Sequence, residues 1–433
     1  MKVFLGSIGC RLNQSELEIL AAQLRAEGHS IVGNGTEAQA AIVNSCTVTN
    51  AADADSRKMV NRLHRDGVQT IILTGCWASV DLINDAKLPE GTICVPNSQK
   101  EHIVQQYFTD NEHTPFVQPM GRIPLPGKAR RTRAFIKVQE GCDYHCTYCI
   151  TRIARGKSVS VPIETILDDI RSAVFTGTKE IVLTGTQLGG WGKDFSEKRT
   201  ISDLVRVILK ETDIPQIRLS SIEPWDIDEV FFALLSEPRF CDHLHLPLQS
   251  GCSRTLKRMG RRMSPAEYAH LLEQLRSHKD DLAITTDILV GFPGETQTDH
   301  LESIHFVQEM QFAGGHVFRY SPRPGTPAAL FADQVDEKVK KKRNKAMREV
   351  VERSTAAYRS QYIDREVKVL WERGQKEGDG GWRMHGLSTN YLRIQAPTPK
   401  NLWNQISHVV INKDQGRFME GCILDGSKMD DVS

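Results

Sequence analysis

The amino-acid sequence predicts an α/β protein in three parts: an N-terminal parallel sheet, a central partial (βα)6 barrel and a small C-terminal β-barrel. Apolar, strand-like runs alternate with helical segments over residues 1–110 and again over residues 132–335. Such alternation is typical of parallel sheets covered by helices. Residues 363–427 instead hold short β-rich segments separated by turn residues, which favour a small barrel. The 433 residues leave room for roughly two to four domains of about 150 residues each.

Three apolar runs of the N-terminal part each end in a cysteine. The runs are KVFLGSIGC, AAIVNSC and TIILTGC, and they lead to Cys10, Cys46 and Cys76. The carboxyl ends of parallel strands meet at one edge of a sheet, where ligands bind. We therefore expect these three cysteines, which we call the sheet triad, to lie close together. The alternative is three unrelated buried cysteines, because free cysteine is often buried.

Six strand-like runs, mostly separated by amphipathic helices, form the central part, and the chemistry of such a barrel sits at the C-terminal ends of its strands. Residues 111–131 hold four prolines and little periodicity, so we predict a linker there. The basic run GKARRTR at its end either contacts phosphates or is solvated. Residues 336–362 are predicted to form a long connecting helix whose basic face is solvated. The six runs are AFIKVQ, EIVLTG, QIRLSS, HLHLPL, AITTDILVG and HVFRYS.

The composition narrows the possible functions. The chain has no run of about 18 apolar residues, so we expect no membrane-spanning helix, and its start lacks the pattern of a signal peptide. We therefore expect a cytoplasmic protein, whose thiols stay reduced. In that compartment ten cysteines favour metal binding or catalysis over disulfides. The net charge is only +1, so any affinity for nucleic acid must come from local basic patches.

Three more cysteines crowd the segment EGCDYHCTYCI, directly after the first strand of the central part. Cys142, Cys146 and Cys149 form this second group, which we call the loop triad. A structural zinc site normally uses four ligands, and no fourth Cys or His stands at zinc-finger spacing. Three thiolates can instead hold three irons of a 4Fe–4S cluster and leave the fourth iron open. The cysteines predicted to serve only in packing are Cys94, Cys241, Cys252 and Cys422.

The C-x3-C-x2-C spacing, with the aromatic Tyr148 before its last cysteine, resembles the signature of radical S-adenosylmethionine (SAM) enzymes. GCRLNQSELE, VNSCTVTNAADADSRK and LTGCWA resemble the N-terminal domain of the methylthiotransferases in that group. LTGTQLGGWG, LSSIEP, HLHLPLQSGCSRTLKRMGR and TTDILVGFPGET resemble their barrel, while HVFRYSPRPGTPAA and HGLSTNYLRI resemble its end and the RNA-binding TRAM domain. One departure is Thr151, which stands where the family often has proline, although Arg155 and Gly156 keep the register.

The resemblance implies a flavodoxin- or Rossmann-like N-terminal domain, a radical SAM barrel and a TRAM barrel. It also implies one 4Fe–4S cluster on the loop triad and an auxiliary 4Fe–4S cluster on the sheet triad. Of two SAM molecules per turnover, one yields the radical that removes hydrogen from C2 of an adenine, and the other methylates the sulfur that is transferred. NSCTVTNAAD and FRYSPRPGTPAA resemble most the branch that modifies N6-threonylcarbamoyladenosine at position 37 of tRNA.

The resemblance further implies SAM contacts at the strand ends, although each of these residues could instead be ordinary strand-end polarity. None is expected to act as an acid or base, because hydrogen-atom abstraction needs no such group. The residues are Tyr148, Thr184, Gly185, Thr186, Gln187, Glu223, His245, Gln249, Asp287, Gly291 and Pro293.

The implied partners are the anticodon arm of tRNA, an electron donor such as a flavodoxin or ferredoxin, and a sulfur donor. Asn13 and Arg155 are expected to contact the substrate. Trp382, Tyr391 and Arg393 of the terminal domain are candidates for stacking on exposed bases. For the two aromatic residues the alternative is a place in the core of the barrel.

Two other functions are compatible with part of this pattern. The same chemistry could act on an isopentenylated adenosine or on an aspartate of a ribosomal protein, because these enzymes share the cluster motifs. A non-catalytic iron–sulfur protein that binds RNA is the second alternative. Such a protein would not need the strand-end motifs for SAM, which are present here.

Overall fold

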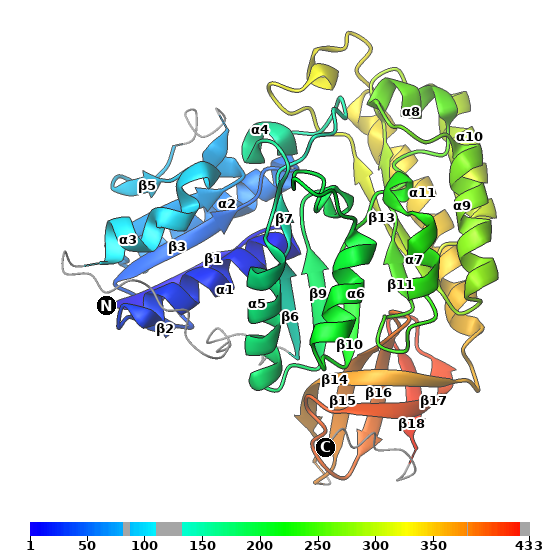
Figure 1. The fold of residues 1–433 in the computed structure, drawn as a ribbon. Helices are drawn as coiled ribbons and strands as arrows, with labels where there is room; N and C mark the ends of the chain where they lie inside the picture. The colour runs from blue at the N-terminus through cyan, green and yellow to red at the C-terminus, as the bar shows by residue number, and fades with distance from the viewer. Residues whose placement is uncertain (81–86, 110–131, 379, 425–433) are drawn as a thin grey trace. The chain divides into compact units, whose positions relative to one another are not determined.

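The computed structural model describes residues 1–80, 87–109, 132–378 and 380–424 (Figure 1). The expected linker 111–131, most of GKARRTR and residues 425–427 of the expected terminal domain lie outside this range. The chain forms two compact units. Unit 1 comprises residues 1–176, 183–204 and 321–331, and unit 2 comprises 177–182, 205–320 and 332–433. Among the described residues, none of the helices has the length and apolar character that a membrane span requires.

The N-terminal part of unit 1 is a five-stranded parallel sheet, which confirms the expected fold of this region. The three runs that lead to the sheet triad form β1, β3 and β4. The edge strands β2 and β5 were not predicted from the sequence, because three residues are too few to show a period. The order across the sheet is β2 (Ser30–Val32), β1 (Lys2–Ser7), β3 (Ala40–Ser45), β4 (Thr70–Gly75) and β5 (Thr92–Cys94).

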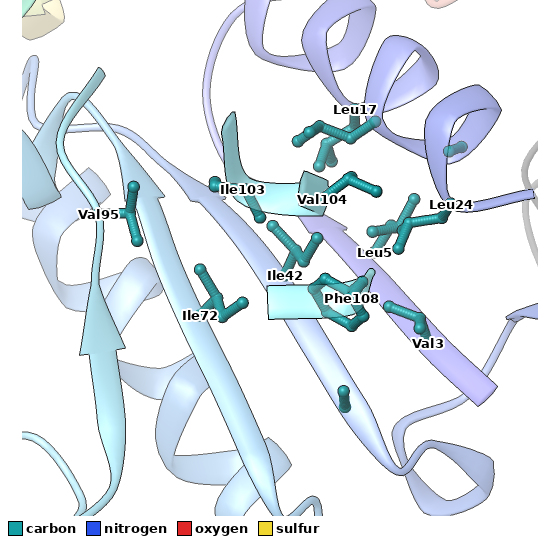
Figure 2. Close-up of a cluster of buried hydrophobic side chains, with 13 residues drawn as sticks. Val3, Leu5, Leu17, Leu24, Ile42, Ile72, Val95, Ile103, Val104 and Phe108 are labelled. Carbon is teal, nitrogen blue, oxygen red and sulfur yellow. The ribbon is translucent and has the colours of Figure 1, made fainter. Parts of the chain in front are cut away.

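Both faces of this sheet are buried by helices, because its strands are apolar on both sides. On one face Val3, Leu5 and Ile42 pack against α1 (Arg11–Ala26) and α3 (Ile103–Phe108), as Figure 2 shows. On the other face a second cluster includes residues of α2 (Asn50–Arg65). Successive strand residues point to opposite faces, so strands covered on both sides read as continuous apolar runs.

The central part contains the six expected strands, in two three-stranded sheets ordered β10-β9-β6 and β11-β12-β13. The strands are β6 (Arg133–Lys137), β9 (Glu180–Thr184), β10 (Gln216–Leu219), β11 (His243–His245), β12 (Ala283–Val290) and β13 (Gly314–Arg319). The helices are α4 (Thr151–Arg155), α5 (Ile163–Phe175), α6 (Ile201–Glu211), α7 (Glu229–Leu234), α8 (Ser253–Met259), α9 (Pro265–His278) and α10 (Gln297–Glu309). An additional short pair, β7 (Gln139–Glu140) with β8 (Val159–Ser160), flanks the loop triad.

A closed five-stranded barrel follows the long helix α11 (Glu337–Ser360), as expected. The segment HGLSTNYLRI, quoted above, spans the end of one strand and the start of the next, which are joined by a turn at Tyr391, whose φ is 69°. Trp371, Met384 and Val409 fill the barrel core. The strands are β14 (Glu366–Lys376), β15 (Trp382–Ser388), β16 (Arg393–Thr398), β17 (Ile406–Asp414) and β18 (Met419–Ile423).

A buried ion pair fastens the terminal barrel to the rest of unit 2. Arg218 and Glu180 are both fully buried, with 2.9 Å between Nε and Oε1. The same guanidinium donates to the carbonyl oxygens of Ser388 and Thr389, at 3.1 and 2.9 Å. Breaking a buried ion pair by removing one partner typically costs about 3–5 kcal/mol, because the remaining charge is uncompensated. The position of the terminal barrel against the rest of unit 2 therefore depends on Arg218.

We predict that Arg218→Met destabilises unit 2 by about 3–5 kcal/mol, because Glu180 stays buried without its partner. The double substitution Arg218→Met/Glu180→Leu should recover most of that loss, since it leaves no buried charge. Arg171→Met is the matched control. Its exposed pair with Asp168 should be worth less than about 1 kcal/mol.

Peptide-resolved hydrogen exchange over β10, β15 and β16 gives the free energy of opening for each variant. Protection equal to wild type in Arg218→Met would show that the buried pair does not hold the barrel in place.

Candidate functional site

The sheet triad lies at the carboxyl edge of the N-terminal sheet. Cys46 and Cys76 directly follow β3 and β4, and Cys10 stands just before α1. Gly9 lies against Cys46, where an added Cβ would be 2.6 Å from the Cys46 Cβ and 2.9 Å from its sulfur. Gly9 also has a φ of +105°, which L side chains rarely adopt. Glycine at this position therefore lets the end of β1 approach Cys46 closely.

Asn13 joins the ends of the first strands and brings Cys10 into contact with them. Its side-chain amide donates to the carbonyl oxygens of Ile8 (2.8 Å) and Ser45 (3.0 Å), while its Oδ1 lies 3.5 Å from the Cys10 sulfur. Burial, together with the neighbouring Cys76 and Cys10 thiols, raises the pKa of Cys46 to about 12. Cys46 is therefore a neutral thiol near pH 7 unless a metal takes the place of its proton.

A buried network of charges surrounds the triad. The Arg155 side chain, only 2% exposed, pairs with Glu16 and Glu140 at 2.7 Å each. Lys100 also contacts Glu16, at 2.7 Å. Burial alone would raise the pKa of Glu16, but the adjacent Arg155 and Lys100 cations hold it well below its usual range. Glu16 is thus ionised, as buried charges are when they are well paired.

The loop triad lies between β7 and α4, in a loop fixed by backbone hydrogen bonds. The Cys142 amide donates to Gly156 O at 3.1 Å, and the Cys149 amide donates to Cys146 O at 3.1 Å. Gly141, with a φ of +74°, starts the loop at a point where an added Cβ would be 1.8 Å from a backbone oxygen of Lys157. All three cysteines are half-buried. Thr151, at the family's proline position, is the first residue of the short helix α4.

Neither triad has the geometry of a site for a single ion. In the described part of the chain, the one group of three ligands whose atoms all lie within 4.8 Å of one another is Cys252, Asp299 and Glu302. Asp299 in that group already caps α10 and pairs with Arg254, so its carboxylate is engaged. A 4Fe–4S cluster takes its thiolates on separate irons and needs them farther apart. Three cysteine thiols at each position fit such a cluster.

The SAM-binding residues expected in unit 1 adjoin the loop triad. Gln187 accepts a hydrogen bond from the Asp143 amide inside the triad loop, at 2.8 Å. Gly185 lies against Gln139, and the Thr186 hydroxyl is buried without a hydrogen-bond partner in the structure. Thr184 is buried at the end of β9, and Tyr148 is half-buried. An unpaired buried hydroxyl beside the triad loop is a candidate ligand contact.

In unit 2, three of the expected SAM-binding residues come together at the ends of β11 and β12. His245 Nε2 lies 3.3 Å from an Asp287 carboxylate oxygen. The backbone N–H of Gln249 donates to the backbone carbonyl oxygen of Asp287 at 2.8 Å. Glu223 is instead engaged by Arg261, at 3.0 and 2.6 Å.

The last two expected SAM-binding residues lie in the turn after β12. The Gly291 amide donates to Glu295 at 2.6 Å, and Pro293 O accepts a hydrogen bond from Arg258. The Gly291 amide and the Pro293 carbonyl oxygen are thus already paired within the protein.

Three of the expected substrate contacts are not supported by this structure. Asn13 and Arg155 are buried, and their polar side-chain atoms are bonded to protein groups. The Tyr391 ring stacks on His243, with 3.9 Å between ring centroids and 11° between ring planes. Trp382 packs partly buried against the barrel core, whereas Arg393 is exposed. Asn13 and Arg155 are buried among protein partners, and the half-buried Tyr391 ring is occupied by His243.

Sequence reasoning also missed part of the site and misjudged two cysteines. Glu16, Glu140 and Lys100 were not singled out, because no local motif marks contacts between residues so far apart in the chain. Cys94 and Cys422 are exposed, which corrects the expectation that they are packing residues. Cys241 and Cys252 are buried, as expected.

Comparison with known families identifies the two cysteine-bearing regions separately. Residues 136–307 match the family described as the Radical SAM superfamily, and residues 2–90 match the one described as "Uncharacterized protein family UPF0004". Membership in the radical SAM superfamily implies a 4Fe–4S cluster and SAM. The loop triad lies inside the first match and the sheet triad inside the second.

Several curated proteins are similar over most of their length. Threonylcarbamoyladenosine tRNA methylthiotransferase MtaB of Thermotoga maritima is 38% identical over 84% of this chain and 85% of that protein. The protein of the same name from Bacillus subtilis is 33% identical over 96% of this chain and 94% of its own. The tRNA-2-methylthio-N(6)-dimethylallyladenosine synthase of Sphingopyxis alaskensis is 31% identical over 86% of this chain and 87% of that protein.

Solved structures share the fold at low identity. The radical SAM methyltransferase TsrM from Kitasatospora setae has a TM-score of 0.55 at 15% identity, over 76% of this chain and 77% of its own. The cobalamin-dependent radical SAM enzyme OxsB has a TM-score of 0.50 at 12% identity, over 81% and 56%. With relatives above 30% identity along most of its length, the chain belongs to the radical SAM methylthiotransferase family of enzymes.

Proposed function

We propose that this enzyme adds a methylthio group to C2 of N6-threonylcarbamoyladenosine at position 37 of tRNA. The observation that carries the proposal is the pair of cysteine triads, one in each of the two family matches. The relatives favour this nucleoside, because the proteins named threonylcarbamoyladenosine tRNA methylthiotransferase reach 38% identity. The synthases named for dimethylallyladenosine reach 30–32%. Dimethylallyladenosine is therefore the second candidate.

In this proposal the loop triad holds the 4Fe–4S cluster that binds SAM, and the sheet triad holds the auxiliary 4Fe–4S cluster. The two clusters and SAM supply a 5′-deoxyadenosyl radical and the methylthio group. We propose that Gln187 and Thr186 contact SAM, because Gln187 bonds the loop that holds the loop triad. His245, Gln249 and Asp287 are likewise proposed SAM contacts. The remaining SAM-site candidates stay predictions.

We propose the same domain limits as the sequence indicates, with residues 1–110 for the auxiliary cluster, 132–335 for radical chemistry and 363–427 for RNA. Because the net charge is near zero, binding of the anticodon arm depends on local cations of the terminal barrel. Arg373, Lys376 and Arg393 are exposed there. The enzyme would act in the cytoplasm with a flavodoxin or ferredoxin as electron donor and a separate sulfur donor.

The substrate is tested by analysing the nucleosides of tRNA from cells that lack this protein. We expect loss of 2-methylthio-N6-threonylcarbamoyladenosine and accumulation of its precursor by mass spectrometry. If the threonylcarbamoyl nucleoside keeps its methylthio group and the dimethylallyl nucleoside loses it instead, the result would favour the second candidate.

Replacing each triad by alanine separates the two clusters. The loop variant Cys142→Ala/Cys146→Ala/Cys149→Ala should lose formation of 5′-deoxyadenosine, because no SAM-binding cluster remains. The sheet variant Cys10→Ala/Cys46→Ala/Cys76→Ala should keep SAM cleavage but lose methylthio transfer. Each should fall from roughly eight to roughly four irons per chain.

Each triple variant serves as the control for the other, since both lose three thiols. Methylthiolated tRNA from the sheet variant, or 5′-deoxyadenosine from the loop variant, would refute the corresponding assignment.

Three exposed cations of the terminal barrel test RNA binding. Arg373→Ala/Lys376→Ala/Arg393→Ala should lower tRNA affinity and reduce the slope of log K against log salt by up to about 2. Each lost contact to a single-stranded phosphate accounts for about 0.7. The control removes three exposed cations of α11, in Lys341→Ala/Lys342→Ala/Lys345→Ala. Fluorescence anisotropy with an anticodon stem-loop gives both quantities, and equal slopes in the two variants would count against the barrel.

A further inference from the structure

The feature that carries a further inference is a hydrogen bond to one sulfur of the sheet triad. Arg155 Nε donates to Cys76 Sγ at 3.1 Å. The rest of the guanidinium is held by Glu16 and Glu140 through Nη1 and by Asn13 through Nη2, at 2.7 Å each. Because the guanidinium is a planar fork with fixed donor directions, these acceptors fix the direction of the Nε–H bond.

The group that donates to Cys76 is a charged guanidinium, and its own charge is the one nearest to the sulfur. The cations of the surrounding network, Arg155, Lys100 and Lys137, pair with the carboxylates of Glu16, Glu140 and, at 3.9 Å, the exposed Glu101, so its formal charges cancel. A buried positive charge stabilises negative charge on nearby groups more strongly than an exposed one, because the local dielectric constant is low. Any group bound to Cys76 therefore meets a hydrogen-bond donor that is itself a buried cation, the Arg155 guanidinium.

We propose that Arg155 is a positioning residue which, through its hydrogen bond to Cys76, raises the reduction potential of the auxiliary cluster. The inference rests on the proposed function, since it assumes that the sheet triad holds a cluster. Hydrogen bonds to the sulfurs and the local charge both set the potentials of iron–sulfur clusters. A hydrogen bond to a thiolate withdraws electron density from the metal and favours the reduced state.

A higher potential suits the proposed transfer. If the auxiliary cluster carries the methylthio group, a carbon radical that forms a C–S bond with it would use one electron of a sulfur electron pair, and the cluster would take up the other. Accepting that electron is easier at a higher potential. Arg155 is also next to Gly156, whose carbonyl oxygen accepts a hydrogen bond from the backbone amide of Cys142. Two consecutive residues therefore contact both triads.

The test is a redox titration, followed by electron paramagnetic resonance, of the full chain in the Cys142→Ala/Cys146→Ala/Cys149→Ala background, where only the auxiliary cluster remains. Arg155→Met/Glu16→Gln removes the donor and leaves the net charge unchanged. We expect its potential to fall by at least the equivalent of a tenfold change in the ratio of oxidised to reduced cluster, about 59 mV for one electron. The control, Arg323→Met/Asp53→Asn, removes another buried pair, whose arginine also donates to the hydroxyl of Thr47, the residue after Cys46.

Each result decides the inference. A potential that falls in the Arg155 variant but not in the control, at equal iron content, supports it. An unchanged potential at equal iron content overturns it and leaves the proposed function intact. If the background variant itself holds no iron, the sheet triad is no cluster site, and both the inference and the proposed function fail.

A second measurement needs no destabilising variant. The same full chain, labelled with 15N-arginine, should show a 15N hyperfine coupling on the reduced auxiliary cluster, and Arg155→Lys should abolish it while retaining the charge. Absence of the coupling in the labelled parent would overturn the inference even if the Arg155→Met/Glu16→Gln variant does not fold.

Discussion

The arrangement of the sheet triad depends on the hydrogen bonds that the buried guanidinium of Arg155 makes. It touches the sulfur of Cys76, the amide oxygen of Asn13 and the carboxylates of Glu16 and Glu140. Removing one member of such a network leaves a buried polar group unpaired, which costs more than the lost hydrogen bond itself. Asn13 also contacts the Cys10 sulfur through its Oδ1. Gly156, the residue after Arg155, accepts a hydrogen bond from the backbone amide of Cys142 in the loop triad.

Local pattern was sufficient to predict the elements that place the cysteines. The runs ending in Cys46 and Cys76 are mostly apolar because both faces of the sheet are covered, and such runs can be recognised in a single sequence. The six central strands were predicted from similar apolar runs between helices, and the terminal barrel was predicted from short β-rich segments between turns. The edge strands β2 and β5 were missed, because segments of three residues carry no period.

The polar contacts of the site could not be predicted in the same way. Arg155 and Glu16 are 139 residues apart in the chain, and the spacing of charged residues does not reveal which distant partner each will find. The sequence therefore suggested that Arg155 and Asn13 face the substrate, whereas both are buried. Tyr391 shows the same limit: an aromatic residue in a turn of an RNA-binding barrel suggested base stacking, but its ring lies on His243.

The most direct test of methylthio transfer to threonylcarbamoyladenosine follows the methyl group itself. Reduced, iron-loaded enzyme would be incubated with SAM carrying a CD3 methyl group and with tRNA that contains N6-threonylcarbamoyladenosine, and the nucleosides would be weighed by mass spectrometry. We predict a product that carries both a new sulfur and the intact CD3 group on the adenine. Conversion of SAM to 5′-deoxyadenosine with the nucleoside unchanged would contradict this prediction.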